Sequence, residues 1–434
     1  MINTLSKHLK AESLDSNKVS NSVVIFHPGH VLVCYNSALA LQQAGMLSSF
    51  ETGIYFKRPS FLSVLLSKLP SNIAKRMHKE FMRRHHDGLS IEKIKTHSLI
   101  ETMYLLTARL SFLNRFSYSV MRLRNKLLAN RAGLNALKSN PNGLIGYDSC
   151  FLEAFLMVKK SGITCVLDQI VGSWSAEKKI LDLERELNPD FASTIPEFRD
   201  DVMIQQTLDE AVVADKILVA SEYVRDTIIN DGIPAEKIAL CPYGVDVNRF
   251  SPAPIERDNK TFKVLFVGQL TQRKGVKYLL EAFSKIDLPN VELILMGAIA
   301  GDGEALKPYR DIFTYIRNVP YAELPRYYQS ADIFVYPSLH EGSALAIYEA
   351  LASGLPVVTT FNSGSVVRDG IEGYVVPVQD PDAIKEKIES LYHNIPLRKR
   401  MGAAARLRAE TFSWEAYRER VAGIYKDISC EEIK

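Results

Sequence analysis

Short apolar runs alternate with amphipathic segments along most of this chain. In the first half, runs rich in Val, Ile and Leu predict strands, and the segments between them show helical spacing. The strands are expected at 22–26, 144–147, 164–168, 216–220 and 237–243, and the helices at 31–44, 151–161, 177–187 and 222–230. Ser221 directly precedes the last helix, where its hydroxyl can cap free amides. The stretch 60–138 is expected to be mainly helical.

The alternation pauses at 251–260, a polar stretch with two prolines and several charges that we interpret as a linker. It then restarts, with strands expected at 263–267, 291–296, 332–336, 356–360 and 374–377, and helices at 275–284, 322–330, 343–353 and 381–393. Alternating strands and helices favour parallel sheets covered on both faces. Two such halves predict two doubly wound, Rossmann-like α/β domains that face each other across a cleft, with ligands at the carboxyl ends of the strands.

Composition and length narrow the class of protein. The 434 residues and 47% hydrophobic content suffice for two domains with cores of their own. No apolar run reaches the roughly 18–20 residues of a membrane span, and the polar segment 1–20 lacks the apolar centre of a secretory signal. The cysteines, at positions 34, 150, 165, 241 and 430, lack metal-type spacing and are typical of reduced thiols. We therefore expect a cytoplasmic protein.

The net charge of +3 conceals a basic stretch. Residues 57–131 contain 16 Lys and Arg against 4 Asp and Glu, a local net charge of +12 that leaves −9 for the rest of the chain. One interpretation is a surface that contacts an anionic acceptor or an anionic membrane, which would place the protein at the inner face of that membrane. The other interpretation is a set of ordinary surface helices whose charges are solvated.

The first motif with chemical content is 264–275, VLFVGQLTQRKG. A buried strand would end at Gly268, where the missing side chain lets a ligand approach the backbone. Arg273 and Lys274 follow before the next helix and can bind phosphate oxygens, with help from the helix N-terminus. The alternative is a tight strand-to-helix turn with two solvated cations. The GxxxxGK[ST] pattern of a P-loop is absent from the sequence.

The second motif is 340–349, HEGSALAIYE. Glu341 lies in a loop that follows a predicted strand, and Glu349 lies along the next predicted helix, where it could accept hydrogen bonds from a ribose diol. The start of that helix offers a glycine and free amides to a phosphate, at Gly342, Ser343, Ala344 and Leu345. A glutamate near a helix start is favourable for dipole reasons alone. That alternative accounts for one glutamate and leaves the glycine and the loop glutamate unexplained.

With both motifs in this order, the run 264–377 resembles the donor domain of retaining GT-B glycosyltransferases, glycosyltransferase family 4. Glu341 and Glu349 match the family's Glu-x7-Glu motif, and 273–275 match its Arg-Lys-Gly donor loop. The segment 241–250 resembles the family's hinge-side motif, and 412–428 resembles its last helices. The resemblance is close over 205–430 and weak over 22–204.

This resemblance implies a GT-B fold, with a polar tail over 1–20, an N-terminal acceptor-side domain over 21–250, a C-terminal donor-binding domain over 251–411 and a C-terminal helix over 412–434 that packs back on the first domain. It implies transfer of a hexosyl or related group from a nucleotide-diphosphate sugar to a hydroxyl of a carbohydrate or lipid-linked acceptor, in polysaccharide or glycolipid synthesis. No metal or other cofactor is expected, because the protein's cations stabilise the leaving diphosphate. The acceptor then enters on the same face, with retention of configuration.

The resemblance also assigns roles to residues. Arg273 and Lys274 would hold the diphosphate, and Glu349 the ribose. Glu341 and the amides from Ser343 to Leu345 would contact the sugar and the distal phosphate. We therefore take Glu341, Arg273 and Lys274 as catalytic candidates, and expect the loop around Gly29 to approach the donor from the other domain.

Two departures concern the acceptor side. The family often has Gly-Gly-x-Pro-Glu after the strand at 356–360, whereas this chain has FNSGS at 361–365. The family's histidine after the strand at 164–167 is replaced by Asp168, which could act as an acceptor-side base or cap a helix. His30 could contact either substrate, although a loop histidine is more often structural.

Other functions fit parts of the sequence. An epimerase or a phosphorylase could use the same scaffold, because a fold hosts many functions. A non-catalytic sugar-nucleotide-binding partner would have little need of Arg273, Lys274, Glu341 and Glu349 together. A nucleic-acid-binding protein is suggested only by the basic stretch, which lacks interleaved aromatic residues.

Overall fold

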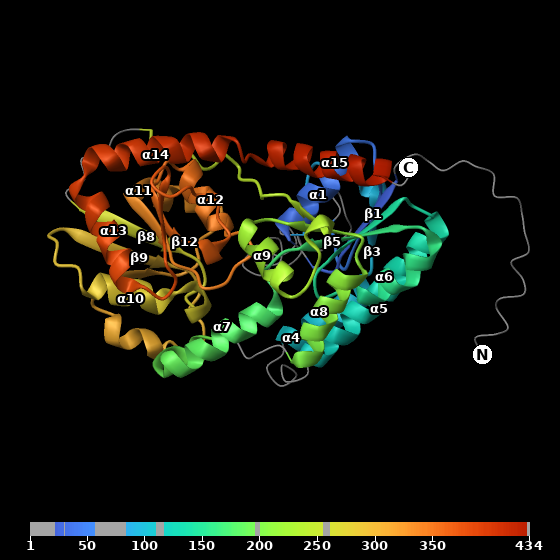
Figure 1. The fold of residues 1–434 in the computed structure, drawn as a ribbon, viewed down its shortest axis with the longest axis horizontal. Coiled ribbons are helices and arrows are strands. Elements are labelled where there is room, and N and C mark those ends of the chain that lie inside the picture. The colour runs from blue at the N-terminus through green and yellow to red at the C-terminus, as the bar shows by residue number, and fades with distance from the viewer. Residues whose placement is uncertain are drawn as a thin grey trace, which may run out of the picture.

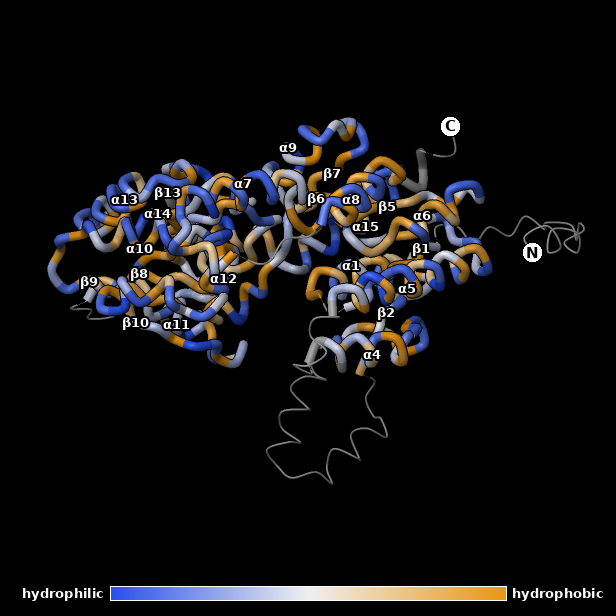
Figure 2. The backbone as a smooth tube through the Cα atoms, turned by 90° about the horizontal axis from the view of Figure 1, so that it is seen from below, coloured by the Kyte–Doolittle hydropathy of each residue, from blue (hydrophilic) through white to orange (hydrophobic). Residues whose placement is uncertain are grey.

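The computed structural model describes residues 22–29, 31–56, 84–109, 117–195, 200–254 and 261–431. The predicted polar tail, His30 and a large part of the basic stretch lie outside these ranges. Within them, no helix is both long and apolar enough to cross a bilayer. Figure 2 shows the two halves of the molecule side by side along its long axis.

The first half is built on a parallel sheet of seven strands in the order β3-β2-β1-β4-β5-β6-β7. Its central strands are fully buried, as Val24, Ile25 and Phe26 illustrate, because helices cover both faces. The strands are β1 (Val23–His27), β2 (Leu47–Thr52), β3 (Ile94–Thr96), β4 (Gly143–Tyr147), β5 (Thr164–Gln169), β6 (Lys216–Val219) and β7 (Ile238–Leu240). The helices are α1 (Leu32–Gln43), α4 (Ser98–Arg109), α5 (Ser117–Ser139), α6 (Leu152–Val158), α7 (Trp174–Leu187), α8 (Asp201–Val213) and α9 (Glu222–Asn230).

The second half is built on a parallel sheet of six strands in the order β10-β9-β8-β11-β12-β13. The strands are β8 (Phe262–Val267), β9 (Val291–Met296), β10 (Phe313–Ile316), β11 (Ile333–Tyr336), β12 (Val357–Thr360) and β13 (Gly373–Val376). The helices are α10 (Val276–Ser284), α11 (Leu324–Ser330), α12 (Leu345–Ala352), α13 (Pro381–His393), α14 (Ile395–Glu410) and α15 (Trp414–Glu431). The predicted fold class, two doubly wound Rossmann-like α/β units, is confirmed.

Each sheet has one point at which the strand order reverses. In the first sheet β1 lies between β2 and β4, and in the second β8 lies between β9 and β11. The loops that leave the two strands at such a point diverge, so a crevice opens at their carboxyl ends. In the second half, this rule selects the loop after β8, with Gly268, Arg273 and Lys274, and the loop after β11, with Glu341.

The chain crosses between the halves twice. Val245, after β7, pairs with Ser413, which joins α14 to α15. Helix α15 then packs against α1, where the Tyr417 and Ser37 hydroxyls lie 2.9 Å apart (Figure 1). The domain limits inferred from the sequence stay a prediction.

Several elements were not expected. Strand β3 interrupts the stretch 60–138, and the sequence analysis assigned nothing to β2, β10, α8 or α14. Strand β2 shows one reason. Its sequence is LSSFET, yet it is mostly buried, and its Glu51 has no exposed surface. The Glu51 carboxylate accepts a hydrogen bond from Asn135 at 2.9 Å and lies 3.1 Å from the His97 ring, so partners distant in sequence make a polar strand tolerable.

Candidate functional site

The loop after β8 is shaped by a short helix and a glycine. Gln272–Lys274 form the 3-10 helix η6, and Thr271 caps it by accepting the Lys274 amide at 3.3 Å. Gly275 ends η6 with a φ of 69°, and a side chain there would place its Cβ 2.0 Å from the Pro337 carbonyl oxygen. Only glycine fits this turn, because it is both left-handed and closely packed. The turn fixes the direction in which Arg273 and Lys274 leave the backbone.

The loop after β11 is joined to η6 through one carbonyl. The Arg273 carbonyl oxygen accepts the Leu339 amide at 2.9 Å and the Ser338 hydroxyl at 3.1 Å. The two loops at the reversal point of the second sheet therefore form one unit. Gly268, at the end of β8, lies beside this unit, because an added Cβ would be 3.4 Å from the Lys274 side chain.

Three predicted site residues meet in this unit. The Glu341 carboxylate lies 3.4 Å from Arg273 Nη1 and also contacts Lys274 Nζ. The Tyr336 hydroxyl, at the end of β11, lies 3.4 Å from the same carboxylate oxygen. The three charged side chains are between 12% and 20% exposed, so the cluster is largely desolvated but reachable. The chain brings two cations and one carboxylate together at the crevice.

The charges of the cluster depend on one another. Burial alone would raise the pKa of Glu341, but Lys274 and Arg273 outweigh burial, and the pKa is lowered. Burial would lower the pKa of Lys274, but Glu341 raises it above its ordinary value. All three groups are therefore ionised near neutral pH. The cluster has a net charge of one positive unit, which favours binding of an anion.

Glu349 lies apart from this cluster. It is part of α12, and its carboxylate accepts a hydrogen bond from the Tyr328 hydroxyl at 2.8 Å. Burial raises the pKa of Glu349 to about 7, although the Tyr328 and Tyr321 hydroxyls and Arg249 oppose the rise. Within the described part of the chain, no hydrogen bond or ion pair joins Glu349 to Arg273 or Lys274.

The amides before α12 are only partly available. Helix α12 begins at Leu345 rather than at 343, and the Ala344 amide donates to the Ser363 carbonyl at 3.1 Å. The expectation of a free amide at Ala344 is therefore wrong, because the loop after β12 supplies an acceptor. An anion-binding role at this helix start rests on the Ser343 and Leu345 amides. The Ser343 hydroxyl donates to the Gly364 carbonyl at 2.7 Å, which fixes the turn.

The glutamate loop also touches the first half of the chain. The Ser221 hydroxyl, at the start of α9, donates to the Gly342 carbonyl at 2.5 Å. The Tyr223 hydroxyl lies 2.7 Å from His340 Nδ1. An added Cβ at Gly342 would lie 1.7 Å from the Ile170 carbonyl oxygen, so a side chain is excluded there. The two halves are in direct contact beside the charged cluster.

Gly29, predicted to approach the donor, and the acceptor-side candidates Asp168 and His30 belong to the first half. Gly29 follows β1, and its carbonyl accepts the Thr52 hydroxyl at 3.3 Å. Among the described residues, no hydrogen bond joins Gly29 to the charged cluster. Asp168 lies near the carboxyl end of β5 and is 4% exposed. Burial, followed by the charge of Asp148, raises its pKa to about 8, so the carboxyl is mainly protonated at pH 7. His30 lies outside the described residues.

Sequence reasoning missed two residues next to the cluster. Tyr336 is the last residue of β11. Its place at the carboxyl end of a strand, where a crevice is expected, was the signal that could have identified it. Glu177, in the first turn of α7, lies 3.9 Å from Arg273 Nε. No sequence pattern links Glu177 to a loop almost a hundred residues later. Within the described ranges, no group of three or more His, Cys, Asp or Glu residues could hold a metal ion.

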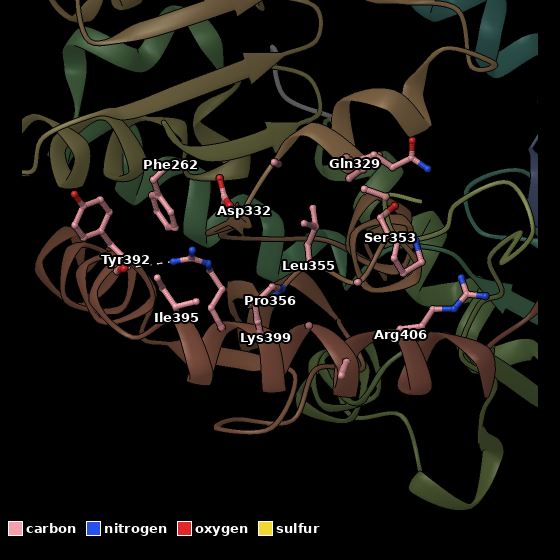
Figure 3. Close-up of a pocket in the computed structure, with 18 of the residues that line it drawn as sticks. Phe262, Gln329, Asp332, Ser353, Leu355, Pro356, Tyr392, Ile395, Lys399 and Arg406 are labelled. Atoms are coloured by element: carbon pink, nitrogen blue, oxygen red, sulfur yellow. Dashed lines mark hydrogen bonds between the residues drawn. The ribbon is translucent and has the colours of Figure 1, made fainter. Parts of the chain in front are cut away.

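A groove of the second half lies away from the charged cluster. Its volume is about 1210 Å³, and Phe262, Asp332 and Pro356 line it (Figure 3). These residues lie at the amino ends of β8, β11 and β12, opposite the edge that carries Lys274 and Glu341. Ala253 and Thr261 also line the groove and flank residues 255–260, which lie outside the described ranges. We therefore do not assign this groove to the site.

Comparison with known proteins finds relatives of the second half of the chain. Residues 247–408 match the family model described as glycosyl transferases group 1. D-inositol 3-phosphate glycosyltransferase of Paenarthrobacter aurescens is 29% identical over 44% of this chain and 54% of its own length. The putative colanic acid biosynthesis glycosyltransferase WcaL of Escherichia coli is 30% identical over 36% of this chain and 42% of its own. The chain thus spans about half the length of these curated relatives.

A solved structure extends the likeness to both halves. Anabaena HepE in complex with UDP-glucose superimposes with a TM-score of 0.61 at 12% identity, covering 94% of this chain and 99% of that one. At this identity the likeness concerns the fold alone. Residues 247–408 are thus similar to the glycosyl transferases group 1 family, within a chain that has the two-domain GT-B fold.

Proposed function

We propose that this protein is a retaining glycosyltransferase of glycosyltransferase family 4. It moves a hexosyl or related group from a nucleotide-diphosphate sugar to a hydroxyl of a carbohydrate or lipid-linked acceptor. The observation that carries this proposal is the cluster of Arg273, Lys274 and Glu341 at the strand-order reversal of the domain that matches the group 1 family. Two adjacent, largely desolvated cations at a crevice suit a diphosphate.

Each donor-side residue has a role in this proposal. Arg273 and Lys274 bind the diphosphate, whose oxygens compete with the Glu341 carboxylate for the same two cations. The carboxylate is then free to contact the sugar. Glu349, once ionised, accepts hydrogen bonds from the ribose. Gly268, Gly342 and the Ser343 and Leu345 amides allow close approach of backbone to phosphate.

The chemical step follows from this arrangement. Positive charge from Arg273 and Lys274 stabilises the nucleoside diphosphate as it leaves, without a metal ion. The acceptor hydroxyl then attacks the anomeric carbon from the face that the diphosphate has left, and its proton passes to an oxygen of the departing diphosphate. His30 and Asp168 are proposed to lie on the acceptor side of the crevice, and the loop around Gly29 is proposed to approach the donor from the first half. The binding of UDP-glucose by HepE supports a nucleotide sugar as donor.

For the acceptor and for the cellular location of the protein, we propose only a class. The description of WcaL supports an acceptor in polysaccharide or glycolipid synthesis. We propose that the basic stretch 57–131 lets the protein reach such an acceptor at the cytoplasmic face of an anionic membrane. This stretch should then bind anionic lipid vesicles at low salt and release them at high salt. Absence of binding at low salt would remove the membrane proposal alone.

The donor site is tested with UDP as a probe. Lys274→Ala and Arg273→Ala should each weaken UDP binding by about tenfold to a hundredfold, the usual cost of removing a charge-assisted hydrogen bond. Lys285→Ala is the matched control, because Lys285 is a half-exposed lysine of the same half that pairs with Asp382. Equal UDP affinity in wild type, Lys274→Ala and Arg273→Ala, measured by calorimetry, contradicts the site.

The reaction class needs a separate measurement. Nucleotide sugars that raise the melting temperature identify the donor, and its products are then followed with and without added glycan acceptors. A glycosyltransferase releases nucleoside diphosphate faster with acceptor and forms a glycoside of retained configuration. Interconversion of the free nucleotide sugar would instead indicate an epimerase, and phosphate-dependent release of a sugar phosphate a phosphorylase. Tight donor binding without turnover would indicate a binding partner.

A further inference from the structure

Helix α7 connects the first half of the chain to the loop that carries the two cations. Its N-terminal cap, Ser173, contacts Asp231 at the end of α9, in the first half. From there α7 (green in Figure 1) runs toward α10 of the second half. Glu177 and Glu184 lie two turns apart on one face of α7, because seven residues correspond to about two helical turns. Both carboxylates point at η6.

Glu184 is held in a cage of hydrogen-bond donors. It has no exposed surface. Its carboxylate accepts from the Gln272 side-chain amide at 2.6 Å, from the Tyr278 hydroxyl at 2.9 Å and from the Asn188 amide at 2.8 Å. The Gln379 side-chain amide is a fourth donor. Three of these four partners belong to the second half of the chain.

The chemistry of the cage requires a carboxylate. An ionised carboxylate is an acceptor at both oxygens, whereas glutamine replaces one oxygen with an NH2 group that only donates. Three of the four partners present an amide NH2 group, so the NH2 group of a glutamine at position 184 would be set against donors within a buried space. A buried charge is tolerated only when it is hydrogen-bonded in this way. The cage therefore selects glutamate among residues of this size.

Gln272 connects Glu184 to the two cations, Arg273 and Lys274. It is fully buried and begins η6, so Arg273 and Lys274 are the next two residues. Its side-chain amide is held by Glu184, and its backbone amide donates to the Thr194 hydroxyl at 3.0 Å. Its side-chain oxygen accepts the Lys277 amide at 3.3 Å, which ties η6 to α10. The residue before the two cations is thus fixed through main chain and side chain, in both cases by the first half.

We propose that Glu184 is a positioning residue for the donor site. Through Gln272 it sets the position of η6, and so the places at which Arg273 and Lys274 meet a diphosphate. The functional part of this inference rests on the proposed function, because it assumes that the two cations bind the donor. Glu184, in the first half of the chain, then contributes to donor affinity without itself contacting the donor.

The test uses Glu184→Gln in the full chain, with two readouts. Hydrogen–deuterium exchange of the peptide spanning 271–278 should be at least threefold faster than in wild type, because η6 loses its buried anchor. UDP affinity should fall about tenfold, and the KM for the donor should rise while the KM for the acceptor stays unchanged. Glu186→Gln, on the exposed face of the same helix, should change neither readout.

Two further variants distinguish a positioning role of Glu184 from a general stabilisation of the contact between the two halves. Gln272→Met keeps a linear side chain but removes the link to Glu184, and should reproduce both effects even if Glu184→Gln fails to fold. Asp190→Asn removes the negative charge from the 2.7 Å contact with Lys277 Nζ at the same interface and does not alter the Gln272 side chain. It should lower the melting temperature without changing UDP affinity. Loss of UDP affinity in Asp190→Asn equal to that in Gln272→Met would overturn the positioning role.

The outcomes distinguish this inference from the proposed function. If Lys274→Ala weakens UDP binding but Glu184→Gln and Gln272→Met do not, the positioning role is wrong and the donor site stands. If Glu184→Gln speeds exchange at 271–278 while Lys274→Ala leaves UDP affinity unchanged, the link to η6 stands and the proposed function is wrong. Unchanged exchange at 271–278 in a folded Glu184→Gln protein rejects the link itself.

Discussion

The Asp168 carboxyl group is buried and lies close enough to the Asp148 carboxylate to be affected by its charge. It lies near the end of β5, 4% exposed, and burial together with Asp148 raises its pKa from 3.8 to about 8. The folded protein therefore keeps a proton on Asp168 that the unfolded chain releases above about pH 4. Stability must fall as pH rises between these two pKa values, by up to about 1.4 kcal/mol per pH unit.

Asp168→Asn should remove this dependence, because asparagine has nearly the same shape and does not titrate. Between pH 5 and 7.5 the free energy of unfolding of the variant should gain on that of wild type by about 1 kcal/mol per unit. Urea unfolding at three pH values measures the difference, with Asp311→Asn as an exposed control. A constant difference would mean that Asp168 is ionised in the folded protein. Such a carboxylate would be the better candidate for an acceptor-side base.

The sequence predicted the residues of the charged cluster better than their partners. Arg273, Lys274 and Glu341 follow strands that the apolar pattern located correctly, so their meeting could be expected from the order of the elements. Glu184 could not be found in this way. Its partners lie between 4 and 195 positions away, and an alternation of apolar and polar residues carries no information on such pairing.

The helices and strands that the sequence did not predict are those that bury few large apolar side chains. The missed strand β10 carries two exposed residues among its four, and β3 has only three residues at the edge of its sheet. Edge strands need no continuous apolar run, so the pattern that located β8 and β11 cannot detect them. Helix α14 was missed for a related reason. Its buried positions are mainly small residues, among them Gly402, Ala405 and Ala409, which pack closely without a strong amphipathic pattern.

Gly275, in the turn between η6 and α10, and Gly370 both have a left-handed backbone but differ in their surroundings. Gly275→Ala combines a left-handed backbone with a close approach to the Pro337 carbonyl, whereas Gly370→Ala, at a φ of 74°, meets open space. The strained backbone alone costs about 1–2 kcal/mol, and the clash adds a similar amount at position 275. Denaturant unfolding should therefore show a loss of about 3 kcal/mol for Gly275→Ala and about half of that for Gly370→Ala.

UDP affinity separates the two glycines further. Gly275→Ala should weaken it, because the Pro337 carbonyl pushes η6 and its cations aside, and Gly370→Ala should leave it unchanged. Equal losses of stability and of UDP affinity in the two variants would show that packing against Pro337 does not shape the site.

In the whole molecule, one arginine ties the crossing segment to the second half. The Arg406 guanidinium, on α14, donates to the carbonyls of Val247 at 3.0 Å and Phe250 at 2.9 Å, both in the segment that leaves the first half. It also donates to the Ala352 carbonyl at 2.9 Å, at the end of α12. The same segment pairs with Ser413 through Val245. Arg406 therefore holds one of the two covalent connections against the body of the second half.

Arg406→Ala should loosen the relative placement of the halves while leaving the charged cluster intact. Three carbonyls lose a charged donor, which should cost about 2–3 kcal/mol of unfolding free energy. UDP affinity should stay within twofold of wild type, because neither η6 nor Glu341 contacts Arg406. The rate of transfer to an acceptor should fall at least fivefold, because the proposed function assigns donor and acceptor to different halves, which must be aligned. Arg310→Ala, at an exposed ion pair, is the control. If UDP affinity and transfer rate fall in equal proportion, Arg406 acts on the donor site itself and the separation of the two halves by function is wrong.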